Sequence, residues 1–160
     1  MWMEVTSTRG KGEVMVPSDY LICQLANTMW AESHDDGVLG MTVCGLIIRN
    51  RMLAGWEDGQ WLRLIEKHDS FNMPDEGTPP RVMKLGDPHH DPLFRRCLAI
   101  AENIYNGRER DITDIGKGGV GGALWYCKLN ECSEKFRDTI VRHLDQHPLI
   151  ASVGRISCFR

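Results

Sequence analysis

The sequence predicts an α+β fold that is mainly helical, with a small β element near the C-terminus. Its 160 residues are a usual size for one domain with a buried core. Apolar residues recur at helical spacing in several stretches, whereas 123–127 and 150–159 mix aromatic and apolar residues as strands do. We therefore expect one domain over 17–160, preceded by an arm over 1–16 with little structure of its own.

The first predicted helix carries the most informative acidic residue. It begins at Ser18 as N-cap, and Leu21, Leu25 and Met29 then form one apolar face. Glu32 continues this line, about 20° short of two full turns from Leu25. Burial and the negative end of the helix dipole would both raise the pKa of Glu32, as a general acid requires. Alternatively, Glu32 marks where the helix leaves the core and points into water.

The second predicted helix covers 38–53 and stops at Gly55. It is apolar on most sides, which is typical of the buried centre of a domain. Gly40 and Gly45 lower its helix propensity, so we expect them to allow close approach of a neighbouring helix or a substrate. Asn50, near its end, is either a buried polar group that needs partners or a cap of the helix end.

The remaining elements follow from similar patterns. A short helix over 61–68 places His68 on one side with three apolar residues, and 73–90 form a Pro/Gly-rich loop. Asp91 caps a helix that ends before Gly107. Ser133 caps a last helix carrying Phe136, Ile140 and Leu144.

Composition and cysteine usage exclude several classes of protein. The net charge is −3 without a basic block, which disfavours nucleic-acid binding, and no run reaches the ~18 apolar residues of a membrane span. The N-terminus lacks the pattern of a signal peptide.

Cys127 and Cys132 do not form a C-x-x-C pair, and we expect reduced thiols. His143 and His147 have metal-binding spacing, but we expect a solvated helix end, no metal and no cofactor.

Five short segments occur in an informative order. They are Ala31-Glu32-Ser33-His34, Leu46-Ile47-Ile48-Arg49-Asn50-Arg51, Ser70-Phe71-Asn72, 101–107 with Asp111-Ile112-Thr113 and Gly122-Ala123-Leu124-Trp125-Tyr126, and Val153-Gly154-Arg155-Ile156-Ser157-Cys158-Phe159. In this order they resemble the SleB/CwlJ-type cell wall hydrolase family, known from spore-cortex-lytic enzymes and phages. The resemblance spans about 19–160. It departs from the family at His34, where Arg is usual, and at Ile156, where the family has His.

The resemblance implies a lysozyme-like domain that acts on the glycan strands of peptidoglycan, with Glu32 as the catalytic acid. The residues that would line the cleft and bind sugars are Phe71, Asn72, Trp125 and Tyr126. The residues that would support the site from behind are Asn50, Arg51 and His34.

Among the reactions that cleave such strands, we expect that of a lytic transglycosylase, in which one carboxyl group is both acid and base. An ordinary glycosidase needs a second carboxylate, and no spacing singles one out among Asp35, Asp36, Asp69 and Asp111. The alternatives are a hydrolytic muramidase with a second acid and a glycan-binding virion or coat protein without activity. We expect a monomeric phage lysin released from the host cytoplasm, or a virion-associated one.

Overall fold

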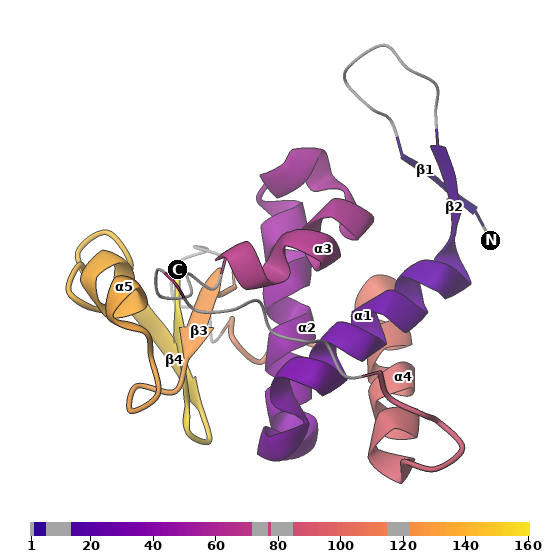
Figure 1. Ribbon diagram of the computed structural model, residues 1–160. Coiled ribbons are helices and arrows are strands. Elements are labelled where there is room, and N and C mark those ends of the chain that lie inside the picture. The colour runs from indigo at the N-terminus through magenta and orange to yellow at the C-terminus, as the bar shows by residue number, and fades with distance from the viewer. Residues whose placement is uncertain (1, 6–13, 72–76, 78–84, 115–121) are drawn as a thin grey trace.

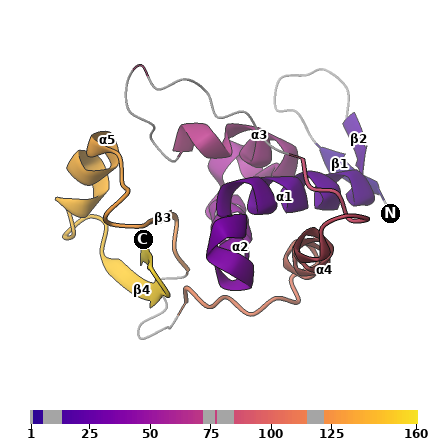
Figure 2. The same cartoon turned by 60° about the horizontal axis from the view of Figure 1, so that its bottom comes forward.

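The computed structural model describes residues 2–5, 14–71, 77, 85–114 and 122–160. The fold is mainly helical, with a small antiparallel sheet near the C-terminus, as the sequence predicts. Figure 1 shows α2 at the centre, with α4 on one side and the sheet on the other, and Figure 2 shows the same order from a second direction. The longer helices are α1 (Ser18–Ser33), α2 (Gly37–Leu53), α3 (Trp61–Phe71) and α4 (Pro92–Tyr105).

The N-terminal residues differ from the prediction of an arm with little structure. The strands β1 (Trp2–Val5) and β2 (Val14–Pro17) pair antiparallel, with Trp2 opposite Pro17 and Val5 opposite Val14. This hairpin projects from the body of the molecule at the start of α1 (Figure 1). Two strands of four residues are too short for alternation to stand out from the surrounding polar residues, which is why the pattern was not visible.

Helix α1 buries the predicted face. Leu21, Leu25 and Met29 are all 1% exposed or less. The helix begins at Ser18 itself, with Pro17 rather than Ser18 as N-cap, and ends at Ser33. The short 3₁₀ turn η1 (His34–Asp36) then leads into α2.

Helix α2 is the buried centre that its composition predicts, with a continuous buried stretch over 40–48. A Cβ added at Gly45 would lie 2.6 Å from Ile104 Cδ1 and 2.7 Å from Met29 Sδ. The glycine therefore permits the close approach of α1 and α4, as expected. None of the described helices is long and apolar enough to cross a membrane.

Two further segments complete the helical body. After α2, the turn η2 (Trp56–Gly59) leads into α3, and Asp91 caps α4 by accepting a hydrogen bond from the backbone N–H of Leu93 at 2.9 Å. This cap confirms the prediction for Asp91. Most of the predicted 73–90 loop lies outside the described residues.

The C-terminal sheet has the strand order β3–β5–β4, with all pairs antiparallel. Its strands are β3 (Trp125–Cys127), β4 (Leu149–Val153) and β5 (Ile156–Phe159), so that the predicted 150–159 strand is a hairpin. Ser133 caps the N-terminus of the helix that precedes this hairpin, and its side chain accepts a hydrogen bond from the backbone N–H of Phe136. That helix is shorter than predicted, because α5 (Glu134–Phe136) passes into a π-helical turn, η3 (Arg137–Val141), and Leu144 lies exposed beyond it.

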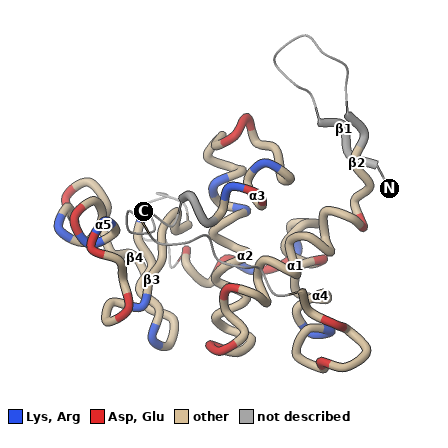
Figure 3. Tube along the Cα trace, in the orientation of Figure 1, with Lys and Arg blue, Asp and Glu red and all other residues tan. Residues whose placement is uncertain are grey.

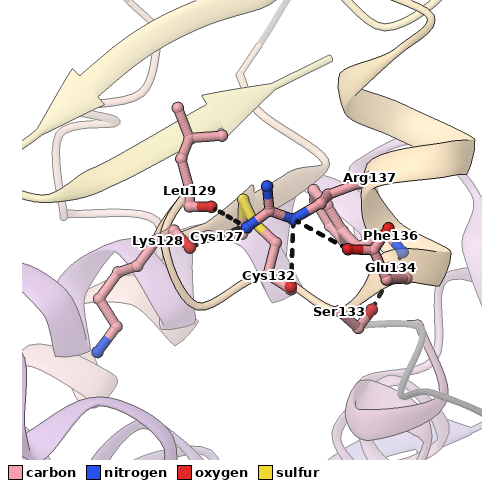
Figure 4. Close-up of a disulfide and its surroundings, with 8 residues drawn as sticks. All are labelled: Cys127, Lys128, Leu129, Cys132, Ser133, Glu134, Phe136 and Arg137. Carbon is pink, nitrogen blue, oxygen red and sulfur yellow. Dashed lines mark hydrogen bonds and ion pairs between the residues drawn. A yellow bond between two sulfur atoms is a disulfide. The ribbon is translucent and has the colours of Figure 1, made fainter.

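The expectation of reduced thiols is wrong for one pair. Cys127 and Cys132 form a disulfide, drawn in Figure 4, that closes the turn between β3 and α5. Arg137 braces this turn by donating to the carbonyl oxygens of Leu129 at 2.7 Å and Cys132 at 3.4 Å. The spacing of the two cysteines excluded a C-x-x-C motif, but it left a disulfide across a turn possible. In the structure their Cα atoms lie 5.9 Å apart, which suits a disulfide. The other four cysteines are free thiols.

Charged side chains of both signs alternate along the described chain. Figure 3 shows Lys and Arg segments interspersed with Asp and Glu segments on the helices and around α5. Several of these form exposed ion pairs, such as Lys67 with Glu57 and Arg63 with Asp58. Such exposed pairs contribute little to stability, so the body is held together mainly by its apolar core.

Candidate active site

The end of α2 binds the segment that leads into β3, and this contact joins two regions that are distant in sequence. Asn50 Nδ2 donates to the carbonyl oxygen of Ala123 at 3.0 Å, and Arg51 Nε donates to that of Leu124 at 2.8 Å. Both side chains are buried. The structure thus confirms Asn50 as a buried polar group with partners, because its side chain bonds a carbonyl across the domain rather than capping its own helix.

Arg51 is a fixed cation inside the domain. Its side chain is 1% exposed, and its guanidinium carbon lies 5.2 Å from the ring centroid of Trp56 and 5.1 Å from that of Trp125. Burial lowers the pKa of Arg51 to about 10, so the group still carries its charge at neutral pH. Contacts with two aromatic faces partly compensate for the water that the cation has lost.

A second set of contacts joins Asp111 and Thr113 to Ala123 and to Asn50. Thr113 donates to Asp111 Oδ1 at 2.7 Å and accepts from the backbone N–H of Ala123 at 2.9 Å, while Asn50 Nδ2 lies 3.5 Å from Thr113 Oγ1. A Cβ at Gly122 would lie 2.0 Å from Asp111 Oδ2 and 2.3 Å from Asn50 Nδ2, which explains why this position is glycine. Asp111 therefore has a structural partner for its carboxylate.

His68, on α3, lies at the centre of a buried polar cluster and is 1% exposed. Its Nδ1 is 3.2 Å from Arg51 Nη1, and its Nε2 is 3.2 Å from the hydroxyl of Tyr126 and 3.6 Å from the sulfur of Cys44. The rings of His68 and Tyr126 are stacked. The cluster brings together residues of α2, α3 and β3.

The neighbouring cysteine and histidine have the composition of a nucleophile and its base, but Cys44 is unsuited to that role. It is fully buried within α2. Burial and, to a smaller extent, the negative charge of Glu32 raise the pKa of the Cys44 thiol far above its ordinary value. Because the thiolate is the reactive form and reactive cysteines are partly exposed, Cys44 is an inert packing residue.

Glu32 lies in the last turn of α1 and is partly buried. Its charge acts on the same cluster. The pKa of Tyr126 is raised by burial first, then by Cys44 and by Glu32, and the charge of Glu32 also raises the pKa of Cys44. Glu32 is therefore near enough to Cys44 and Tyr126 for its charge to act on them, and its side chain is partly buried.

His34 lies elsewhere. Its ring stacks on Trp30 with centroids 4.6 Å apart, and its ring nitrogens contact the Trp30 carbonyl oxygen and Asp35. Trp30 in turn donates from Nε1 to Asp91 Oδ2 at 2.7 Å. Trp30 and Glu32 are about 200° apart around the helix, so His34 belongs to the contact with α4. Within the described residues, its contacts are with Trp30 and Asp35 rather than with Glu32.

The remaining predicted sugar-binding residues occupy different positions. Tyr126 belongs to the His68 cluster, whereas Trp125 is 9% exposed and packs against Phe136, His147 and the guanidinium of Arg51. Phe71 is the last residue of α3, and Asn72 lies outside the described residues.

Sequence reasoning missed the pairing of His68 with Arg51 and Tyr126. The available signal was the position of His68 on the apolar side of its predicted helix, where a titratable side chain needs buried partners. These partners are 17 and 58 residues away in the chain, so no local spacing could identify them.

The other acids considered as a possible second catalytic carboxylate mostly have partners in the structure. Asp36 is ion-paired with Lys128 at 3.2 Å and with Arg155 at 2.9 Å. Asp35 is exposed and contacts His34. The side chain of Asp69 lies outside the described part of the structure. Within that part, no three His, Cys, Asp or Glu side chains converge as metal ligands.

The features that define the site are a partly buried glutamate at a helix end, a buried arginine and a His–Tyr pair in contact with that arginine. No protein-family model, curated protein or solved structure matches this chain.

Proposed function

We propose that this protein cleaves the glycan strands of peptidoglycan as a lytic transglycosylase, with Glu32 as its single acid and base. One observation carries the proposal. A partly buried carboxylate at the end of α1 acts electrostatically on buried groups of α2 and β3, in the region where Asn50 and Arg51 bind the 122–126 segment. These are segments on which the resemblance to cell wall hydrolases rests. The proposal includes a lysozyme-like arrangement, with the acid at a helix end beside a small sheet.

The reaction needs one proton donor that becomes a proton acceptor. Protonated Glu32 gives its proton to the glycosidic oxygen, and the bond between that oxygen and the anomeric carbon breaks. The 6-hydroxyl of the same muramic acid residue attacks the anomeric carbon, and the Glu32 carboxylate takes the hydroxyl proton. The products are a 1,6-anhydro-muramic end and a free hydroxyl on the leaving sugar, and Glu32 is again protonated.

The engagement of the other acids supports a single-carboxylate reaction over hydrolysis. A hydrolytic glycosidase holds a second carboxylate about 5 to 9.5 Å from the first. Asp36 is neutralised by two cations and Asp111 accepts from Thr113, so neither is available to activate water. Asp35 is exposed and contacts His34, whose ring stacks on Trp30.

The proposed supporting roles follow from the contacts. Asn50 and Arg51 hold the 123–124 backbone against α2, and this fixes the start of β3, which carries Tyr126. Sugar binding by Phe71, Asn72, Trp125 and Tyr126 remains part of the proposal. The protein would act on the cell wall as a monomer without a cofactor, as a phage lysin or a virion-associated enzyme.

The test is digestion of purified peptidoglycan followed by mass analysis of the fragments. We expect muramic ends lighter by one water than reducing ends. Glu32→Gln, which keeps the size of the side chain, should lower the rate about a hundredfold or more. Glu66→Gln, a matched change at an exposed position of α3, should leave the rate unchanged.

Three outcomes would contradict the proposal in different ways. Reducing ends would refute transglycosylation and require a second acid. Binding to peptidoglycan without cleavage would favour a glycan-binding virion or coat protein. A fully active Glu32→Gln variant would exclude Glu32 as the acid.

A further inference from the structure

The carboxylate of Asp36 binds one cation with each of its two oxygens, and both cations come from the C-terminal sheet. Oδ1 of Asp36 lies 2.9 Å from Nη2 of Arg155, and Oδ2 lies 3.2 Å from Nζ of Lys128. The side chain of Asp36 is only 12% exposed. A carboxylate removed from water in this way depends on its partners, because loss of both would leave its charge uncompensated.

Lys128 and Arg155 lie at the same end of the sheet. Lys128 directly follows β3, and Figure 4 shows its side chain extending away from the disulfide that closes the turn. Arg155 lies in the two-residue turn between β4 and β5. Because Cys127 is opposite Ser157 in the antiparallel pair of β3 and β5, the residues after β3 and before β5 are neighbours. One carboxylate thus holds two adjacent turns of the sheet.

The other end of β3 is bound at the opposite end of α2. Asn50 and Arg51, near the C-terminal end of α2, donate to the carbonyl oxygens of the two residues just before β3. Asp36 immediately precedes the first residue of α2. The two sets of contacts therefore fasten the sheet to α2 at both ends of the helix.

Asp36 is also closely joined to the helix end that carries Glu32. It follows Glu32 by four residues, across the last turn of α1 and η1. The backbone N–H of Gly37 donates to the carbonyl oxygen of His34, so hydrogen bonding continues through η1. A Cβ at Gly40 would overlap the Cβ of Asp36, which shows that Asp36 packs directly on α2. The place of Asp36 is therefore fixed relative to the end of α1.

We propose that Asp36 is a positioning residue that sets where the end of α1, and with it Glu32, lies relative to the C-terminal sheet. This inference rests on the proposed function, in which Glu32 acts on a glycan strand that residues of β3 help to bind. The acid and the sugar-binding residues then belong to different parts of the fold, and the ion pairs of Asp36 fix the spacing between them. A displacement of about 1 Å in an active site lowers a rate by up to about a hundredfold.

Asp36→Asn tests this role, because it keeps the size of the side chain and removes both ion pairs. We expect kcat for peptidoglycan cleavage to fall about tenfold while KM changes less than about threefold, since the acid is displaced rather than lost. The matched control is Asp58→Asn, which breaks the exposed ion pair with Arg63 and should leave both constants unchanged. A folded Asp36→Asn with the kcat of the parent would overturn the inference.

Substitutions on the sheet side show whether the two cations act through Asp36. Lys128→Gln and Arg155→Gln should each lower kcat about threefold, as expected for ion pairs that are partly exposed. The double Gln variant should be as slow as Asp36→Asn, and adding Asp36→Asn to it should cause no further loss, because all these changes remove the same contact. Lys128→Arg combined with Arg155→Lys keeps both charges and should retain most of the activity that the double Gln variant loses. Independent, additive losses would contradict a shared action through Asp36.

Amide hydrogen exchange in the full-length protein measures this contact without any activity. We expect Asp36→Asn to accelerate exchange about tenfold in both 34–37 and 128–131, while the amides of α4 keep the rates of the parent. Unchanged exchange in these two segments would overturn the inference. If Asp36→Asn does not fold, the double Gln variant takes its place, since the side chains of Lys128 and Arg155 are more exposed than that of Asp36. If the parent protein cleaves no peptidoglycan, the proposed function fails, while the exchange rates still decide whether Asp36 holds the two segments together.

Discussion

Lys128 and Asp36 form an ion pair of 3.2 Å that ties the disulfide-closed turn after β3 to the segment between α1 and α2. Both side chains are largely buried, and Asp36 follows Glu32 by four residues. The turn that follows Tyr126 is therefore anchored next to the helix end that carries Glu32. This ion pair thus links the segment after α1 to the turn after β3.

The disulfide that closes this turn should contribute measurably to stability. Replacing both Cys127 and Cys132 with Ser removes a cross-link around a short loop, which the chain-entropy relation values at about 2 kcal/mol. We expect urea unfolding to show this loss, and a reducing agent to produce the same loss in the parent protein. Cys23→Ser, at an exposed free thiol, is the control and should change stability by less than about 0.5 kcal/mol. A parent protein whose unfolding is unaffected by reductant would contradict the prediction.

Arg51→Lys should destabilise the fold although it keeps the charge. A lysine ammonium cannot reproduce the planar contact with two tryptophan rings or donate from the position of Nε to Leu124. Leaving a buried carbonyl without its partner costs about 1–3 kcal/mol. The measurement is the free energy of unfolding in urea, with Arg63→Lys, a partly exposed arginine of α3, as the matched control. Equal stability of the two variants would show that charge alone matters at position 51.

Gly122→Ala should disturb the site through a steric clash. The added methyl would overlap the side chains of Asp111 and Asn50, and relief of such overpacking costs about 1–3 kcal/mol. We expect lower stability together with lower peptidoglycan cleavage, because Asn50 holds the Ala123 carbonyl. Gly107→Asn is the contrasting control, since φ there is +71° with open space around the added Cβ and asparagine tolerates that conformation. Equal losses in both variants would argue against the close approach at Gly122.

Buried thiols should make the fold sensitive to alkali. Burial raises the pKa of Cys97 from 9.0 to about 12, so between these values the unfolded thiol ionises while the folded one remains protonated. Its contribution to stability is complete below pH 9 and is lost as the pH rises toward 12. Cys97→Ala should therefore reduce the loss of unfolding free energy between pH 9 and 10 by about 1 kcal/mol, measured in urea. This window ends where the buried Arg51 begins to titrate with the opposite sign. An unchanged pH dependence in Cys97→Ala would contradict the prediction.

The helical part of the fold could be predicted from the sequence because each helix carries its own periodic signal. The Leu21–Leu25–Met29 face, the apolar α2 and the Asp91 cap all depend on residues within a few turns of one another. The N-terminal hairpin and the Cys127–Cys132 disulfide were not predicted, because short strands and a bond across a turn leave no comparable pattern in the sequence. Leu144 was misplaced because regular α-helical spacing was assumed past Val141, where a π-helical turn ends the helix.

The candidate site could be predicted only in part for the same reason. Asn50 stood out as a polar residue on an apolar face, and burial confirmed it. Partners such as Ala123 and Tyr126 are fixed by tertiary contacts across 58 to 73 residues, which periodicity does not report. Support of Glu32 by His34 stays a prediction, because the described contacts of His34 are with Trp30 and Asp35 and do not test that role.

The strand order β3–β5–β4 has a consequence for the order of folding. Because β5 is the central strand, β3 has no strand partner until β5 is in place. The helices can pack through contacts among residues that precede β5 in the chain. The strand that carries Tyr126 pairs only with residues about 30 positions later, and such non-local pairing is slower. We therefore expect activity to be regained after helical structure on refolding. If the proposed function holds, a nascent chain that lacks β5 would carry Glu32 without an ordered β3, and we expect it to be inactive.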